Sequence, residues 1–203
     1  MKRKNLRITC NQIVLRDEKR NTDNEDMFRW LNMEEWNYYD EPDEAFQPTS
    51  REAFEARTKE PRKSVSDSHI WQVDTPEGRH LGWVLYYQID EKAGTAYIGI
   101  CLPETDTWGK GYGTIALKLF INHLFNDVGL KDIRATTWTG NHRMRRLAEK
   151  CGFTEIGRSP HRVPVSVRGE SLEFIHYCIS PDEAKRKQNK PPKSSLCWKV
   201  AEK

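Results

Sequence analysis

One stretch of the sequence, residues 97–121, constrains the fold more than any other. It opens with an apolar run, residues 97–102, that is too short for a helix. A loop with three glycines and a lysine follows, and residues 115–121 then carry apolar side chains at helical spacing. This order predicts a β-strand, a tight loop and an α-helix.

The glycines of this loop, Gly109, Gly111 and Gly113, stand at alternate positions at the start of the predicted helix. Because glycine has no Cβ atom, the loop leaves its backbone N–H groups and the positive end of the helix dipole open to an anion. The Walker A sequence is absent, and Thr114 stands where the dinucleotide-binding fingerprint requires its last glycine. The loop therefore predicts a pyrophosphate pocket, and a glycine turn that only packs a strand on a helix is the alternative.

A second motif begins at Asn141, which precedes a helical pattern that ends at Gly152-Phe153. Together with the loop of residues 108–113, this motif resembles the GNAT superfamily of acetyl-CoA-dependent N-acyltransferases, whose Gln/Arg-x-x-Gly-x-Gly/Ala loop binds the CoA pyrophosphate. The resemblance covers about residues 10–180. Three segments are most similar to the subgroup that contains the ribosomal-protein N-terminal acetyltransferases: residues 13–16, 28–32 and 98–102.

The resemblance implies an α/β fold of the GNAT type, in which a mixed and splayed central sheet of about six to seven strands is flanked by about four helices. Residues 1–180 would form this N-acetyltransferase domain, and residues 181–203 a basic C-terminal tail that is extended or weakly ordered. Capping-box patterns at Thr22–Glu25 and Thr49–Glu52 predict the first two helices.

The formal net charge of +3 arises in the C-terminal tail. Residues 181–203 hold seven Lys and Arg against three Asp and Glu, which leaves 26 basic and 27 acidic residues in the rest of the chain. A basic footprint for DNA or RNA is therefore missing from the body of the protein, and no nucleic-acid partner is expected. Nucleic-acid binding through the tail is the least favoured alternative.

No run of the sequence is long enough to span a bilayer, and the basic N-terminus is not followed by an apolar signal core. We therefore expect a cytoplasmic protein with no membrane partner, acting as a monomer or a homodimer. The five cysteines are scattered without a Cys-x-x-Cys pair, so we expect reduced thiols. The six histidines show no ligand spacing, and no metal is expected.

Acetyl-CoA is the co-substrate that the resemblance implies. Its pyrophosphate would lie on the N–H groups of residues 110–114 and its pantetheine arm along residues 100–102, where the N–H of Leu102 would polarise the thioester carbonyl. Asn141 has two interpretations, as a helix N-cap and as a cofactor contact, and Arg146 would contact the cofactor or lie on a solvated helix face. The predicted cofactor-binding residues are Ile100, Cys101, Leu102, Trp108, Gly109, Lys110, Gly111, Tyr112, Gly113, Thr114, Asn141 and Arg146.

The catalytic groups of the family have no direct counterpart in this sequence. Related enzymes carry a tyrosine at the position of Ala148 or a serine at the position of Met144, and both groups are missing. Glu104, which follows the predicted cofactor strand, is a candidate base, and Tyr177 on the last strand is a candidate proton donor. The alternatives are Cys101 or water as the donor and Asp40 or Glu41 as the base.

Residues 36–48 combine aromatic side chains with carboxylates and two prolines and show neither helical nor strand period, which predicts a loop. In the GNAT family this position lies over the acceptor cleft, so the loop would hold a cationic amine. A solvated acidic loop fixed by buried aromatic residues is the alternative. The predicted acceptor-binding residues are Tyr38, Tyr39, Asp40 and Glu41.

These motifs predict an enzyme that transfers acetyl from acetyl-CoA to a primary amine, either a small cationic amine or a protein N-terminus. The amine would attack directly within a ternary complex, because no cysteine has a recognisable His and Asp or Asn partner pattern. The alternative is a CoA-binding sensor or interaction module without catalysis, which the missing groups at Met144 and Ala148 would explain.

Overall fold

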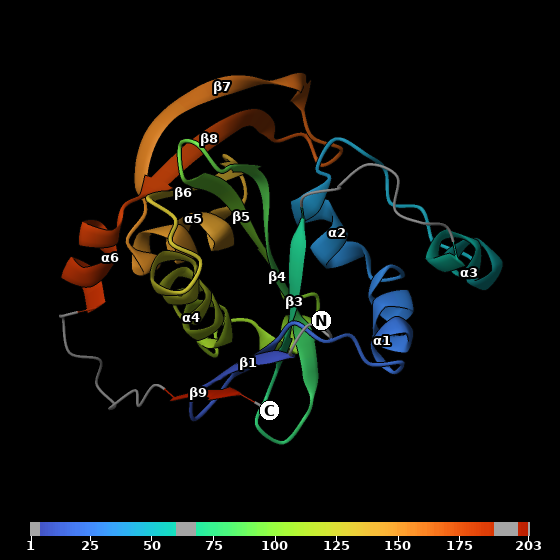
Figure 1. Ribbon diagram of the computed structural model, residues 1–203. Helices are drawn as coiled ribbons and strands as arrows, with labels where there is room; N and C mark the ends of the chain where they lie inside the picture. The colour runs from blue at the N-terminus through green and yellow to red at the C-terminus, as the bar shows by residue number, and fades with distance from the viewer. Residues whose placement is uncertain (1–4, 60–67, 189–198, 203) are drawn as a thin grey trace.

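The computed structural model describes residues 5–59, 68–188 and 199–202. Within these ranges the chain forms one nine-stranded sheet with the order β7-β8-β6-β5-β4-β3-β2-β1-β9 (Figure 1). Of the neighbouring strands described, β5 and β6 are parallel and the others are antiparallel, so the predicted mixed sheet is confirmed. The strands are β1 (Leu6–Thr9), β2 (Val14–Arg16), β3 (His69–Asp74), β4 (His80–Asp90), β5 (Thr95–Cys101), β6 (Asp132–Trp138), β7 (Thr154–Val165), β8 (Ser171–Ile179) and β9 (Lys199–Glu202).

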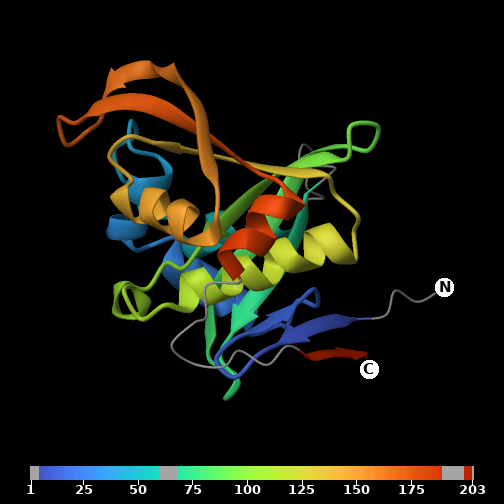
Figure 2. The same cartoon turned by 90° about the vertical axis from the view of Figure 1, so that its left-hand side faces the viewer.

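Helices cover both faces of the sheet. Those in the described ranges are α1 (Asp23–Trp30), α2 (Glu34–Asp40), α3 (Arg51–Lys59), α4 (Tyr112–Asn126), α5 (His142–Cys151) and α6 (Pro181–Gln188). Helices α4, α5 and α6 lie on one face, and α1 and α2 lie on the other (Figures 1 and 2). The α/β fold expected from the resemblance is therefore confirmed.

The main core lies between the sheet and α4. Leu117, Phe120 and Leu124 of α4 are fully buried, as their helical spacing predicts. Alternate residues of the central strands, such as Val84 of β4 and Ile98 of β5, belong to the same buried cluster. Trp83, which points to the other face of β4, packs against Trp30 of α1 and Trp36 of α2, so helices contact both faces of this strand.

The parallel pair β5 and β6 separates partway along its length. Residues 95–97 of β5 pair with residues 132–134 of β6, and the ladder of the described residues goes no further. β5 nevertheless continues to Cys101 and β6 to Trp138. The predicted splay of the sheet therefore lies between these two strands, and the glycine loop and α4 begin at its open end.

The loop predicted over residues 36–48 is partly wrong, because α2 occupies residues 34–40. Trp36 and Tyr38 are both buried, yet they pack on different partners, Trp83 and Trp138 respectively. A short helix that buries two sides has no single apolar stripe, so its sequence lacks the helical period.

The two capping-box patterns predicted helices that the structure contains, but not the hydrogen bonds at the starts of those helices. Thr22 precedes α1 without a side-chain cap hydrogen bond, and Glu25 pairs with the first arginine of α3. At α3 the hydroxyl of Ser50, the residue after Thr49, accepts the N–H of Ala53 at 3.1 Å. A cap one residue away from the predicted position starts the same helix.

The C-terminal segment is more regular than the sequence suggests. Residues 181–188 form α6, which contacts α4 and α5 and buries Ala184. Residues 199–202 form β9, which pairs antiparallel with β1. The expectation of an extended or weakly ordered tail is wrong for residues 181–188, which are helical, whereas residues 199–202 are extended as part of a sheet. Residues 189–198 lie outside the described ranges. None of the described helices is long and apolar enough to cross a membrane.

Candidate active site

A cleft of about 440 Å³ lies where β5 and β6 have separated. It is bounded by the end of β5, the glycine loop, α5 and the aromatic helix α2. Most of the predicted cofactor-binding residues line it: Ile100, Cys101, Leu102, Trp108, Gly109, Gly111, Gly113, Thr114, Asn141 and Arg146. Two do not, because the Lys110 side chain is exposed beside the cleft and Tyr112 packs against the main core.

The glycine loop has the backbone geometry of an anion site. Gly109 and Gly111 have φ angles of +76° and +90°, which L side chains rarely adopt, and a Cβ at either position would meet no atom within 4 Å. Gly111 is the N-cap of α4, and no side chain caps that terminus. The first N–H groups of α4 are therefore left for a ligand.

Trp108 fixes one side of the cleft. Its indole Nε1 donates a 2.6 Å hydrogen bond to the carbonyl oxygen of Leu102. The guanidinium carbon of Arg143 lies 3.8 Å from the Trp108 ring centroid and 4.7 Å from that of Tyr39. This cation–π stack joins the glycine loop, α5 and α2.

Helix α5 contributes both a cap and positive charge. Asn141 Oδ1 accepts the N–H of Met144 at 3.0 Å, which confirms the N-cap, and its Nδ2 lies 3.4 Å from the carbonyl oxygen of Tyr39. Arg143 and Lys150, which the sequence analysis did not name as cofactor-binding residues, line the cleft beside Arg146. Arg143, Arg146 and Lys150 stand three and four residues apart in the sequence, and this helical spacing could have predicted that they share one face.

Only two of the four predicted acceptor-binding residues line the cleft. Tyr39 and Asp40 line the cleft, whereas Glu41 lies outside its lining. Tyr38 is buried, and its hydroxyl contacts Ser166 and Glu170. Sequence analysis missed the contribution of Trp36, which also lines the cleft.

Asp40 is the acidic side chain of the cleft lining, among the residues that the structure describes. Asp40 is exposed to solvent, yet desolvation by the surrounding protein atoms raises the pKa of its carboxyl group. Burial also raises the pKa of Cys101 well above 9.0, and the charge of Asp40 adds to this shift. Cys101 is therefore a neutral thiol, which disfavours it as a nucleophile.

Glu104, the candidate base, lies outside the cleft lining. Its carboxylate accepts the indole N–H of Trp30 at 3.0 Å and forms ion pairs with Arg29 and Arg79. Burial raises its pKa, but the hydrogen bonds from Trp30 and Arg79 outweigh burial and leave the pKa lowered. The structure thus places Glu104 in a contact between α1 and the start of β4.

Tyr177, the candidate proton donor, is 3% exposed and belongs to the main core. Burial raises its pKa, and it is not among the residues that line the cleft. Ala148 is fully buried, while Met144 lines the cleft with an apolar side chain. The family positions for a proton donor therefore remain without a polar group.

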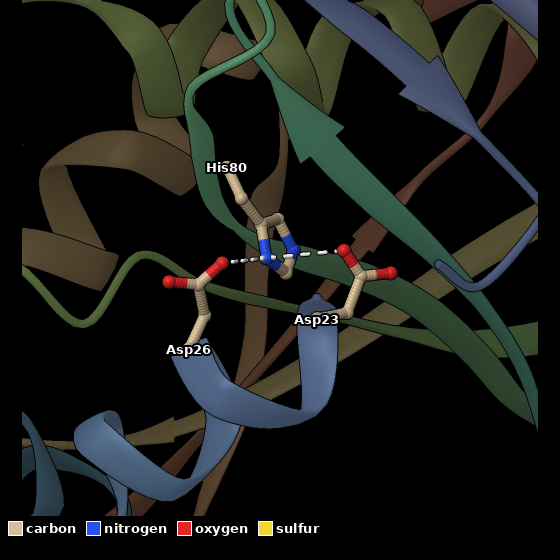
Figure 3. Close-up of side chains that lie close together, drawn as sticks. All are labelled: Asp23, Asp26 and His80. Carbon is tan, nitrogen blue, oxygen red and sulfur yellow. Dashed lines mark hydrogen bonds and ion pairs between the residues drawn. The ribbon is translucent and has the colours of Figure 1, made fainter. Parts of the chain in front are cut away.

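A group of acidic side chains and a histidine lies outside this cleft. His80 Nδ1 is 3.1 Å from Asp26 Oδ2 and 3.5 Å from Asp23 Oδ1 (Figure 3). The three side chains could offer ligand atoms to a metal ion, because these atoms lie within 4.8 Å of one another. Spacing in the sequence does not reveal the group, since α1 and β4 supply it. Both oxygens of Asp23 already accept hydrogen bonds from the buried Arg16.

Residues 12–154 match the protein family described as Acetyltransferase (GNAT) domain. A curated relative, the "Probable N-acetyltransferase YjcK" of Bacillus subtilis (strain 168), is 28% identical over 116 residues. That match covers 57% of this chain and 63% of the relative, so the chain spans less than two thirds of the relative's length.

Two solved structures share the fold. The spermidine N-acetyltransferase from Vibrio cholerae, in complex with CoA and spermine, superposes with a TM-score of 0.69 at 18% identity, covering 86% of this chain and 98% of that one. Mycobacterium smegmatis RimJ, in complex with CoA-disulfide, gives a TM-score of 0.65 at 21% identity and covers 90% of both chains. At these identities the likeness concerns the fold alone.

Proposed function

The chain belongs to the GNAT acetyltransferase family, and from this premise we propose that it transfers the acetyl group of acetyl-CoA to a primary amine. One observation carries the proposal. The gap between β5 and β6 opens onto the uncapped N-terminus of α4 at Gly111, and these features together form one cleft. A strand edge beside an anion site suits a ligand with an extended arm and a pyrophosphate.

The residues present fit acetyl-CoA, which supplies an activated acyl carbon when bound. Gly109 and Gly111 leave room for a phosphate against the backbone, and the α4 dipole and the cations of α5 favour its charge. The free edge of β5 at residues 100–102 can donate and accept backbone hydrogen bonds. We assign the N–H of Leu102 to the stabilisation of negative charge on the reacting carbonyl oxygen.

We assign the base to Asp40. An alkylammonium group has no lone pair, so the acceptor must lose a proton before its nitrogen attacks. Asp40 is a carboxylate inside the cleft, close enough to Cys101 on β5 to raise the pKa of that thiol. The raised pKa of Asp40 makes it a stronger proton acceptor than an ordinary aspartate.

The protonation state of Cys101 favours direct transfer within a ternary complex. A covalent acyl-enzyme would need a thiolate, and burial holds this thiol in its neutral form. The amine nitrogen would therefore attack the acyl carbon, and the bond from that carbon to sulfur would break. The nitrogen would release its extra proton to water, and the leaving sulfur would take up a proton from water.

The acceptor that suits this site is a cationic amine. Asp40 faces the cleft, and Glu41, Asp43 and Glu44 follow it on the same segment, which gives the approach from α2 an acidic character. The Vibrio cholerae structure was solved with spermine, so a polyamine is one test ligand, and a basic peptide with a free N-terminus is the other.

An acceptor screen with purified protein tests the proposal. Acetyl-CoA is mixed with spermidine, spermine or a basic peptide, and the free CoA thiol and the acceptor mass are measured. The expected result is acceptor-dependent thiol release with one added acetyl group, absent in Gly113→Asp protein. Binding of acetyl-CoA without turnover on any amine would instead support a CoA-binding module.

A further inference from the structure

Helix α2 is fastened to the turn between β7 and β8, which lies beside it although the two segments are far apart in the sequence (Figure 1). The hydroxyl oxygen of Tyr38 lies 3.1 Å from Ser166 Oγ, and the hydroxyl donates a hydrogen bond to Glu170 Oε2. Tyr38 and Ser166 are each 6% exposed, so water competes little for these bonds. The turn thus holds a side chain that stands two residues before Asp40.

The turn between β7 and β8 also has a defined shape of its own. The N–H of Ser166 donates to the carbonyl oxygen of Glu170 at 2.8 Å. Ser166 Oγ accepts the N–H groups of Arg168 and Glu170 at 3.2 and 3.0 Å. Because that oxygen accepts two N–H groups, its own proton is left to donate to Tyr38, whose proton goes to Glu170. Each hydroxyl proton therefore has one acceptor, which orients the Tyr38 hydroxyl and stiffens the contact.

Further contacts join this turn to α2 and to the residues that follow it. The guanidinium carbon of Arg168 lies 3.9 Å from the ring centroid of Tyr38, and its Nη2 lies 3.2 Å from Glu35 Oε2. The N–H of Val167 donates to the carbonyl oxygen of Pro42 at 2.9 Å. The turn therefore clamps α2 near its start and just beyond its end.

Asp40 is the cleft residue whose position this clamp affects. It is the last residue of α2 and lies between two held points, Tyr38 and Pro42. Burial raises the pKa values of Cys101 on β5 and Tyr87 on β4, and the charge of Asp40 raises both further, so its carboxylate lies near these strands. Because a helix of seven residues has little stability of its own, this placement depends on the contacts that hold α2.

We propose that Tyr38 is a positioning residue for Asp40. Through its bonds to Ser166 and Glu170 it holds α2 so that the carboxylate faces the site of acetyl transfer. The inference rests on the proposed function, in which Asp40 is the base. A base must lie within hydrogen-bond reach of the proton it takes, directly or through one water, so a small displacement of α2 would slow the chemical step. Tyr38, predicted as an acceptor-binding residue, thus acts through Asp40 instead of touching the acceptor.

Kinetics and NMR titration of four variants test the proposal. Tyr38→Phe and Glu170→Ala both remove the hydrogen bond between these two residues, whereas Glu170→Gln keeps an oxygen that can accept it. Thr154→Val is the control, because it removes a 3.1 Å hydrogen bond to Glu183 of α6 at the other end of β7. Each protein is compared with wild type in four measurements: the melting temperature, the affinity for acetyl-CoA, kcat with the fastest of the three acceptors named above, and the pKa of Asp40 from the carbon-13 signal of its carboxyl group.

Tyr38→Phe and Glu170→Ala should lower kcat by about 10- to 100-fold, because a misplacement of about 1 Å costs a comparable factor. Their affinity for acetyl-CoA should stay unchanged, since the hydrogen bond of Trp108 holds the glycine loop to β5. In both variants the pKa of Asp40 should fall toward the ordinary value of aspartate, because a carboxylate released from the cleft is better solvated. Glu170→Gln and Thr154→Val should keep the wild-type kcat and the wild-type pKa of Asp40.

If Tyr38→Phe keeps both the wild-type kcat and the wild-type pKa of Asp40, the inference is overturned and the proposed function stays intact. A loss of acetyl-CoA affinity and melting temperature with an unchanged pKa of Asp40 would also overturn it, because Tyr38 would then support the fold in general. If the wild-type protein acetylates none of the acceptors, the proposed function fails, whereas the change in the Asp40 pKa still decides whether Tyr38 positions Asp40.

Discussion

The indole N–H of Trp108 donates a hydrogen bond to the carbonyl oxygen of Leu102, and this contact ties the glycine loop back to the end of β5. The GNAT pattern has Gln or Arg at this position, where a polar side chain can reach a ligand. Here the polar atom is used internally, and the ring supports Arg143. This contact therefore fixes the edge of β5 relative to the loop that we propose as the anion site.

Trp108→Phe should weaken acetyl-CoA binding by about five- to tenfold, because the variant loses one hydrogen bond worth about 1 kcal/mol and keeps the ring that Arg143 covers. Calorimetry measures the affinity. Trp108→Ala, which loses both contacts, should be weaker still. Unchanged affinity in both variants would show that the orientation of the loop does not depend on Trp108.

Asp40→Asn should lower kcat by about 10²- to 10⁴-fold if Asp40 is the base, with the affinity for acetyl-CoA unchanged. A base acts when it is unprotonated, so the wild-type rate should fall as the pH drops through the raised pKa of Asp40. The pH–rate profile of the variant should lack this acidic limb. Glu41→Gln is the matched control: Glu41 lies outside the cleft lining, so the variant should keep kcat and the fall in rate at low pH. The same acidic limb in Asp40→Asn would assign it to another group.

Glu104→Gln should affect stability rather than chemistry. The folded-state pKa of Glu104 is lowered, so the carboxylate stabilises the protein above its ordinary pKa of 4.5, and this stabilisation is lost as the pH falls through the folded value. We expect a loss of about 1–3 kcal/mol in the free energy of unfolding at pH 7, since charged hydrogen bonds are broken. The difference from wild type should shrink below about pH 4. A large loss of kcat with unchanged stability would contradict this structural role and indicate that Glu104 is the base.

The sequence predicted the elements whose signals are local. Gly111 and Gly152 both adopt the left-handed conformation at helix ends, and Asn141 caps α5, so the loop and both helices around the proposed cofactor site could be placed from their own residues. The separation of β5 and β6 was expected only from the family resemblance, because no sequence pattern shows where the hydrogen bonds between two parallel strands end.

The roles of the catalytic candidates depend on where their side chains point, and the sequence alone does not predict this. Glu104 follows the cofactor strand directly, but the chain has already turned toward α1, so its carboxylate meets Trp30 and Arg79. Tyr177 lies on β8, in a strand as predicted, but its side chain is buried in the core. Asp40 was one of several acidic residues on a segment without helical or strand period, and its place in the cleft depends on the packing of α2 against distant strands.

Arg16 is the buried centre of an ion-pair group that joins β2, α1 and β3. Its guanidinium is fully buried and bonds Asp23 and Asp74, and these bonds outweigh burial to leave the pKa of Asp23 lowered. Arg16→Ala should lower the free energy of unfolding by about 3–5 kcal/mol, because it removes the buried cation that two buried carboxylates share. Arg20→Ala, which removes a half-exposed partner of Asp74, should cost much less. Urea unfolding measures both, and equal costs would contradict a special role for Arg16.

The most direct test of the account is calorimetric titration of acetyl-CoA into wild-type, Gly113→Ala and Gly113→Asp protein. Residue 113 lies in the first turn of α4, and a Cβ there meets only ordinary contacts of 3.7 Å or more, so both variants should fold. An acidic side chain in that turn also favours the helix dipole.

Wild-type and Gly113→Ala protein should bind acetyl-CoA, while Gly113→Asp should keep its melting temperature and bind at least about a hundredfold more weakly, because its carboxylate repels the pyrophosphate. Equal binding by Gly113→Asp, or no binding by the wild-type protein, would contradict the central claim that the glycine loop of this cleft holds the cofactor.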